Sequence, residues 1–133
     1  MVRKRRLLRG LALLLAALLA ASACGGRGET LSGTLAVYTD DAVIIEEVTV
    51  QFKDGDTVLD ILKKAAREAR VHMEYSGAGK LAYVKGIDNL YEFDKGPESG
   101  WKYFVNGEEM RQSAGAYKPG EGDIICWRYV LTL

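Results

Sequence analysis

Alternating hydrophobic and polar positions predict β-strands along much of the chain. A two-residue period is typical of a strand with one face toward a core. The stretches that follow it are residues 34–39, 46–52, 81–87, 101–105 and 124–133. In the last stretch Arg128 is the one charged residue within an apolar run. We therefore expect that stretch to be a central strand that is covered on both faces.

A helical period replaces this alternation after residue 56. The positions that share one stripe are Val58, Leu62, Ala65 and Ala69. A short oxygen-bearing side chain at Asp56 or Thr57 can accept hydrogen bonds from the free N–H groups of the first turn. We therefore expect one helix that ends near Val71, followed by a glycine-containing loop at 75–80. A second loop is expected at 88–98.

The segment from Ser99 to Tyr117 predicts a β-hairpin. Asn106 and Gly107 tolerate the positive φ that a two-residue type I′ turn requires. Before the turn, one strand face carries Trp101, Tyr103 and Val105. After it, Met110 returns beside these aromatic residues. We expect the hairpin to display aromatic surface that binds a partner, although its residues indicate no reaction chemistry.

The order of these elements indicates an α+β fold. Two strands, one crossover helix, a third strand, a hairpin and a buried last strand are compatible with a β-grasp (ubiquitin-like) mixed sheet packed on one helix. Another α+β roll built from the same elements is the alternative.

The N-terminal residues predict export rather than part of the fold. Residues 1–23 combine a basic start with the apolar run 11–21, which has the proportions of a signal peptide. Small residues then precede Cys24, as in the lipobox of bacterial lipoproteins, and lipidation of this cysteine would anchor the protein. An ordinary secretory signal is the alternative. We expect a tether at 24–33 and one domain at 34–133.

Charge argues against nucleic-acid binding. The chain has 18 basic and 18 acidic residues, and five of the basic residues lie in the predicted signal peptide. The mature chain therefore has 13 basic and 18 acidic residues, a net charge of −5. Such a balance disfavours nucleic acid and a basic membrane-binding patch.

Few residues suggest catalysis. His72 is the one histidine of the sequence, and we expect a solvated residue after the helix rather than a metal ligand. If Cys24 is lipidated, Cys126 has no partner for a disulfide, and we expect a small buried hydrophobic residue there. No nucleophile–base pair or paired carboxylates stand out, so we expect a protein that is not an enzyme and holds no metal.

Several segments resemble a known family. GDTVLDILKKA, AYVKGIDNL, SGWKYFVNGEEM, AGAY and GDIICWRY are similar to the transcobalamin-like C-terminal domain (DUF4430). This domain occurs in bacterial lipoproteins and at the C-terminus of vertebrate transcobalamin and intrinsic factor. The resemblance spans about residues 35–129. The pattern SGW-x-Y-x-V-N-G together with GD-I-x-x-W-x-Y is fairly specific to the family.

The resemblance implies a corrinoid site. In the vertebrate proteins this domain covers one face of cobalamin and a helical domain covers the other. On that register the corrinoid contacts fall on Tyr103, Met110 and Val84, and Trp101 is a further candidate. From the residues alone, Tyr103 and Met110 suit an apolar platform and a core equally well, whereas Val84 is explained more simply as core.

The expected function is a lipid-anchored extracytoplasmic binding module in the cell envelope. Its ligand would be cobalamin or another corrinoid, and its role would be linked to uptake. No counterpart of the helical domain is present in this sequence, so binding should be weak unless a transporter or a second domain completes the site. The alternative is a protein-interaction module that docks a transporter or a surface partner without a ligand of its own.

Overall fold

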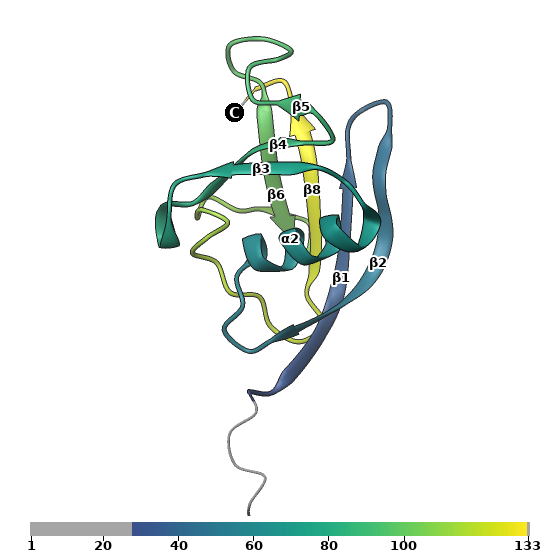
Figure 1. Cartoon of the computed structure of the whole chain (residues 1–133), viewed down its shortest axis with the longest axis vertical. Coiled ribbons are helices and arrows are strands. Elements are labelled where there is room, and N and C mark those ends of the chain that lie inside the picture. The colour runs from purple at the N-terminus through teal and green to yellow at the C-terminus, as the bar shows by residue number, and fades with distance from the viewer. Residues whose placement is uncertain (1–27, 133) are drawn as a thin grey trace, which may run out of the picture.

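The computed structural model describes residues 28–132, which form an α+β fold (Figure 1). One helix accompanies a mixed five-stranded sheet and a small three-stranded sheet, and the α+β class is therefore confirmed. The elements in order are β1 (Thr30–Tyr38), β2 (Val43–Lys53), α2 (Val58–Ala69), β3 (Met73–Ser76), the 3₁₀ turn η1 (Gly79–Leu81), β4 (Tyr83–Ile87), β5 (Leu90–Tyr91), β6 (Gly100–Val105), β7 (Glu108–Glu109) and β8 (Ile124–Val130).

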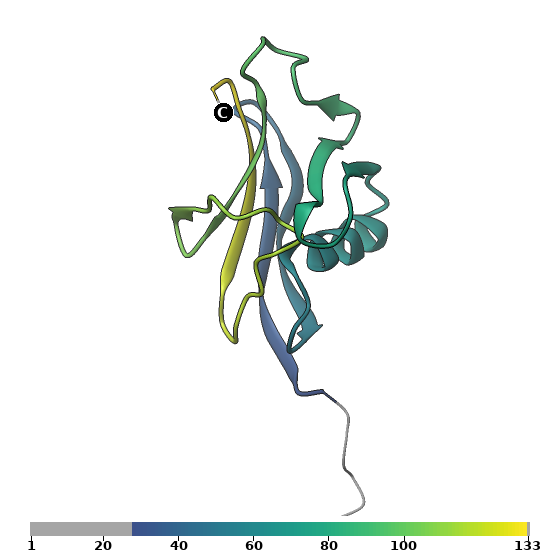
Figure 2. The same ribbon diagram turned by 90° about the vertical axis from the view of Figure 1, so that its left-hand side faces the viewer.

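The larger sheet has the order β2-β1-β8-β6-β7. β8 lies parallel to β1 and antiparallel to β6, so the last strand joins the first to the hairpin. The smaller sheet has the order β3-β4-β5. Figure 2 shows that α2 and the smaller sheet lie on the same side of the larger sheet. The core therefore fills the space between that side of the sheet and these two elements.

The predicted helix is confirmed and begins with a capping box. Thr57 is the N-cap, its hydroxyl accepts from the backbone N–H of Asp60, and the Asp60 carboxylate accepts from the backbone N–H of Thr57. This reciprocal pair satisfies two N–H groups that a helix start leaves free. The helix ends at Ala69, where Arg70 turns into the left-handed region with φ 57°.

Loss of this cap should lower stability moderately. The Thr57→Ala variant is expected to lose about 1 kcal/mol of unfolding free energy, because a first-turn N–H loses its acceptor. The Thr57→Ser variant keeps the hydroxyl and should stay close to wild type. Urea denaturation of the three proteins measures the difference, and equal stability of the alanine and serine variants would show that the cap contributes nothing.

β8 is a central strand, as predicted, but only one of its faces is buried. Ile125, Trp127 and Tyr129 lie in the core, whereas Ile124 is 50% exposed and Arg128 is exposed. The expectation of two covered faces was wrong, because the helix and the smaller sheet cover one side only. Cys126 lies on the outer face and is half-buried, so it is not the core residue that we expected.

The hairpin has the predicted turn but not the predicted exposed surface. Asn106 and Gly107 have φ values of 52° and 83°, which confirms the turn conformation. The returning strand β7 has only two residues. Trp101, Tyr103 and Val105 are 7%, 4% and 5% exposed, so the expectation of an exposed aromatic surface was wrong. Their strand face is the one that meets the helix and the smaller sheet.

Two strands and one turn were not predicted. β3 and β5 lie in segments that we expected to be helix end and loop. Asp88 and Asn89, at φ 53° and 61°, form a two-residue turn between β4 and β5. An Asp-Asn pair after an alternating strand is a recognisable signal for such a turn. β1 also begins at Thr30, four residues earlier than expected and inside the predicted tether.

The predicted signal peptide and Cys24 lie outside the described residues. Across residues 28–132 the structure has no helix with the length and apolar character needed to cross a bilayer. His72 is exposed just after the helix, as expected.

Candidate functional site

The four ligand contacts implied by the sequence line one cavity. Val84 comes from β4, Trp101 and Tyr103 come from β6, and Met110 follows β7. The cavity has a volume of about 130 Å³, and we call it the hairpin cavity. Its other lining residues are Tyr83, Lys102, Gln112, Ser113, Ala114 and Trp127.

Hydrogen bonds and ring contacts fix the aromatic walls of the hairpin cavity. The Trp101 indole N–H donates to the Leu90 carbonyl at 2.8 Å, and the Tyr103 hydroxyl donates to the Gln112 carbonyl at 2.7 Å. The Tyr103 ring lies 5.2 Å from the Trp127 ring, between centroids. The polar groups of Trp101 and Tyr103 are buried and already partnered, so these two side chains form rigid walls and not an adaptable platform.

The rim of the hairpin cavity is more accessible. Met110 is half-buried, and its backbone N–H donates to the Tyr103 carbonyl at 3.1 Å. Tyr83 is exposed, and Lys102 forms an ion pair with Glu109 at 2.7 Å. The unbranched thioether of Met110 can change conformation to follow a ligand. Met110 and Tyr83 are therefore the side chains best placed to meet a ligand from outside.

Trp127 is the largest of the lining residues that were not expected from the sequence. Its side chain is 2% exposed, and its indole N–H has no hydrogen-bond acceptor among the described residues. An unpaired buried donor is costly and rare in native proteins. It becomes understandable if the cavity that Trp127 lines receives an acceptor atom from a bound molecule or from water. The spacing of residues along the sequence does not reveal that a buried N–H group lacks an acceptor.

The ionisation of Tyr103 should make stability fall at alkaline pH. Burial, and to a smaller extent the neighbouring Tyr117, raises the pKa of Tyr103 from 10.0 to about 12. The folded protein thus favours the neutral phenol. The contribution of this pKa shift to the free energy of unfolding is fully present below about pH 10. It is lost as the pH rises through about 12. The unfolding free energy of wild type relative to Tyr103→Phe should therefore fall across this interval. An unchanged difference would contradict the burial of the phenol.

Metal coordination has no support in the described part of the chain. Within residues 28–132, no three His, Cys, Asp or Glu side chains lie close enough to hold one ion. The exposed His72 places its Nε2 atom 3.5 Å from the Tyr91 hydroxyl. The hairpin cavity instead offers aromatic and aliphatic walls, one unpaired donor and a lysine at its rim, which are groups suited to binding.

Solved structures share this fold. The chain is 20% identical to haptocorrin in a complex with Cbi, with a TM-score of 0.65 over 81% of this chain and 27% of that one. It is 15% identical to a Ruminococcus gnavus protein described provisionally as metal-binding, with a TM-score of 0.51 over 75% of this chain and 96% of that one. The chain thus spans about a quarter of haptocorrin. No curated protein matches by sequence.

A family match covers more than half of the sequence. Residues 55–130 match the family described as "Domain of unknown function (DUF4430)". This interval runs from the turn before α2 to the end of β8, and it includes every residue that lines the hairpin cavity. The chain therefore belongs to the DUF4430 family.

Proposed function

We propose that this protein is a lipid-anchored extracytoplasmic module that binds a corrinoid through the hairpin cavity. The observation that carries the proposal is that the four candidate contacts line one cavity together with Trp127, a buried residue whose indole N–H is unpaired among the described residues. The resemblance in fold to haptocorrin in its complex with Cbi supports the same ligand class. Corrinoids carry amide side arms around a macrocycle, and an amide carbonyl is the acceptor that this donor lacks.

The size of the hairpin cavity determines how such a ligand would bind. Its volume of about 130 Å³ is below the range of roughly 300–1,000 Å³ for small-molecule sites. It would therefore hold a side arm, while the macrocycle would lie outside against Met110 and Tyr83. A transporter or a second domain would have to cover the opposite face of the ligand. Without this partner, we expect weak binding.

We also infer a β-grasp arrangement for the larger sheet. The support is the strand order, in which the first and last strands lie side by side and parallel at the centre and the helix crosses one face.

The proposed membrane anchor depends on lipidation of Cys24. Intact-mass analysis of the mature protein tests the anchor, and a chain that starts elsewhere or lacks acyl mass would refute it.

A thermal-shift comparison tests the proposed ligand class. The full-length protein in detergent is heated with cobalamin, with dicyanocobinamide and with protoporphyrin, a flat macrocycle without amide arms. We expect a rise in melting temperature with the corrinoids and none with protoporphyrin. The absence of a shift with either corrinoid, or an equal shift with protoporphyrin, would contradict the proposal.

One observation favours a protein partner as the second candidate. The outer face of the larger sheet is uncovered in the described residues and carries Ile124, half exposed, and the partly exposed Phe104. Exposed apolar residues on a sheet face can mark an interaction surface. If corrinoids fail the thermal-shift test, an Ile124→Glu variant that loses a transporter partner would support this candidate.

A further inference from the structure

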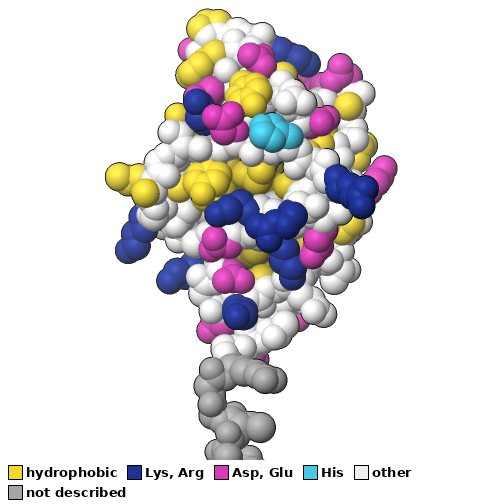
Figure 3. All heavy atoms as spheres, in the orientation of Figure 1, with side chains coloured by type: hydrophobic (Ala, Val, Ile, Leu, Met, Phe, Trp, Pro, Cys, Tyr) yellow, Lys and Arg dark blue, Asp and Glu magenta, His cyan; other side chains and the backbone are white. Residues whose placement is uncertain are grey.

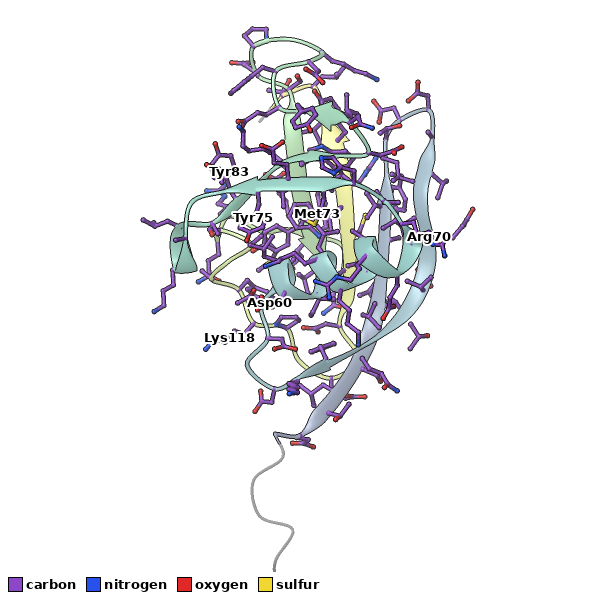
Figure 4. The ribbon with its side chains drawn as sticks, in the orientation of Figure 1. Asp60, Arg70, Met73, Tyr75, Tyr83 and Lys118 are labelled. Carbon is purple, nitrogen blue, oxygen red and sulfur yellow. The ribbon has the colours of Figure 1, made fainter. Side chains whose placement is uncertain are left out.

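A second and larger cavity lies between the start of α2 and the segment that follows β3. Its volume is about 380 Å³, which falls within the range of small-molecule sites. None of its lining residues belongs to the hairpin cavity. Leu59 and Ala82 are its buried apolar residues. Figure 4 shows Tyr75 on β3 and Asp60 at the start of α2 on the same face of the molecule.

Close backbone packing supports the wall of this helix-start cavity. A Cβ atom on Gly115 would clash with the carbonyl oxygen of Gly79 and would crowd Ala82. The hydroxyl of Ser113 donates to the Ala82 carbonyl at 2.7 Å, and the N–H of Gly115 donates to the same oxygen at 3.2 Å. The loop before β4 is therefore held against the segment after the hairpin. The cavity is already formed without a ligand, which lowers the cost of binding.

Lys63 brings a positive charge to the cavity. Its ammonium group lies 4.8 Å from the centroid of the Tyr75 ring and 3.4 Å from the Tyr75 hydroxyl. Among the described residues it forms no ion pair with a carboxylate. The contact with the Tyr75 ring and the one long hydrogen bond leave N–H groups of the Lys63 ammonium available to donate to an anion. Figure 3 shows several basic side chains beside exposed apolar ones on this face.

Asp60 brings a free acceptor to the same cavity. Its Oδ2 atom accepts both from the Thr57 backbone N–H at 3.0 Å and from the Thr57 hydroxyl at 2.8 Å. Its Oδ1 atom has no hydrogen-bond partner within residues 28–132. Residues three apart on a helix are neighbours, with Cβ atoms about 5–6 Å apart. Asp60 and Lys63 therefore present opposite charges side by side.

We propose that the helix-start cavity binds a free α-amino acid with an apolar side chain. The ligand carboxylate accepts from Lys63, and its ammonium group donates to Oδ1 of Asp60. The apolar side chain packs on Leu59, Ala82 and the ring of Tyr75. Each charged group of the ligand thus meets a side chain of opposite charge. No residue that lines this site also lines the hairpin cavity, so the site would be a second binding activity.

An NMR titration of the full-length protein in detergent tests the site with defined probes. L-Leucine and L-phenylalanine are added to about 10 mM, well above a millimolar Kd. Two analogues lack one charge each: 4-methylpentanoate has no ammonium group, and isoamylamine has no carboxylate. The backbone amides of Gly77 and Gly79 report from the cavity, and Gly107 in the hairpin turn serves as the internal control. We expect saturable shifts at Gly77 and Gly79 with the amino acids only.

Matched variants connect the binding to the two charges. Lys63→Met should weaken L-leucine binding by about tenfold or more, because the carboxylate loses its charged donor. The control is Lys64→Met, since the ammonium of Lys64 donates to the Gln51 carbonyl at 3.0 Å and lines a different cavity. Ala78→Phe, at an exposed position that lines the cavity, should also block binding and does not depend on Lys63.

Three outcomes would overturn this proposal. The first is the absence of saturable shifts with both amino acids, and the second is that the analogues bind as well as L-leucine. The third is that the Lys63→Met variant and the Ala78→Phe variant both bind L-leucine as tightly as wild type. Met110→Ala should leave L-leucine binding unchanged. A failure of corrinoid binding would therefore leave the amino-acid site standing, and the converse also holds.

Discussion

Replacement of Trp127 by alanine is expected to lower the free energy of unfolding by about 3–5 kcal/mol. Trp127 lies on the central strand β8, is 2% exposed and packs against the ring of Tyr103. Its truncation removes a large apolar surface and enlarges the hairpin cavity that it lines. The surrounding strands are held by hydrogen bonds on both sides of β8, so they can close the space only partly.

Chemical denaturation of Trp127→Ala and of Ile124→Ala measures this difference. Ile124 lies on the same strand but on its outer, half-exposed face. Its truncation should cost about 1 kcal/mol or less, since little apolar surface is buried there. Similar losses in the two variants would show that the two faces of β8 are equally buried and would contradict the fold.

Replacement of Tyr103 by alanine should have the second large effect, a loss of about 3 kcal/mol or more. The side chain is 4% exposed, and its hydroxyl donates to the Gln112 carbonyl. Its ring lies 5.2 Å from the ring of Trp127 and 6.3 Å from that of Tyr117, between centroids. The hydroxyl alone should contribute less. Tyr103→Phe keeps the ring and should lose about 1 kcal/mol, the usual contribution of one hydrogen bond.

Thermal and denaturant unfolding of both Tyr103 variants separates a packing role from a surface role. A Tyr103→Ala protein that unfolds at nearly the same denaturant concentration as wild type would mean that the ring is not part of the core. Its aromatic face would then be available to a ligand. A large loss places Tyr103 in the core, and direct contact with the macrocycle would be left to Met110 and Tyr83.

Local sequence signals predicted the elements whose causes are local. The helix cap, expected at Asp56 or Thr57 and found at Thr57, depends on neighbouring residues. So do the apolar stripe of α2 and the Asn106-Gly107 turn, and both are present. The central position of β8 also followed from its apolar run. β3 was not predicted because its four residues, with Glu74 and Tyr75 exposed, lack a buried alternating face. Pairing with β4 stabilises β3, and that pairing is not local.

Burial on each face was harder to predict than the strands themselves. Alternation shows that Trp101 and Tyr103 share a face, but not whether that face meets the helix or the solvent. The same limit explains why Cys126 was expected in the core although it lies on the outer face of β8.

The candidate site was predictable in part. The family resemblance indicated Val84, Tyr103 and Met110, and Trp101 was a further candidate. The structure brings these four residues around one cavity. The missing acceptor of the Trp127 indole depends on every atom near that nitrogen, so no pattern in the sequence could reveal it. The helix-start cavity was missed for a similar reason, because its charged residues and its glycine loop meet only in the folded chain.

Calorimetric titration of the full-length protein with dicyanocobinamide tests the central claim most directly. The comparison uses wild type, Met110→Ala and Met73→Ala, because Met73 is also half-buried but does not line the hairpin cavity. We predict saturable binding that Met110→Ala weakens by about tenfold and Met73→Ala leaves unchanged. No saturable heat with wild type, or binding that Met110→Ala leaves as tight as in wild type, would contradict a corrinoid site at the hairpin cavity.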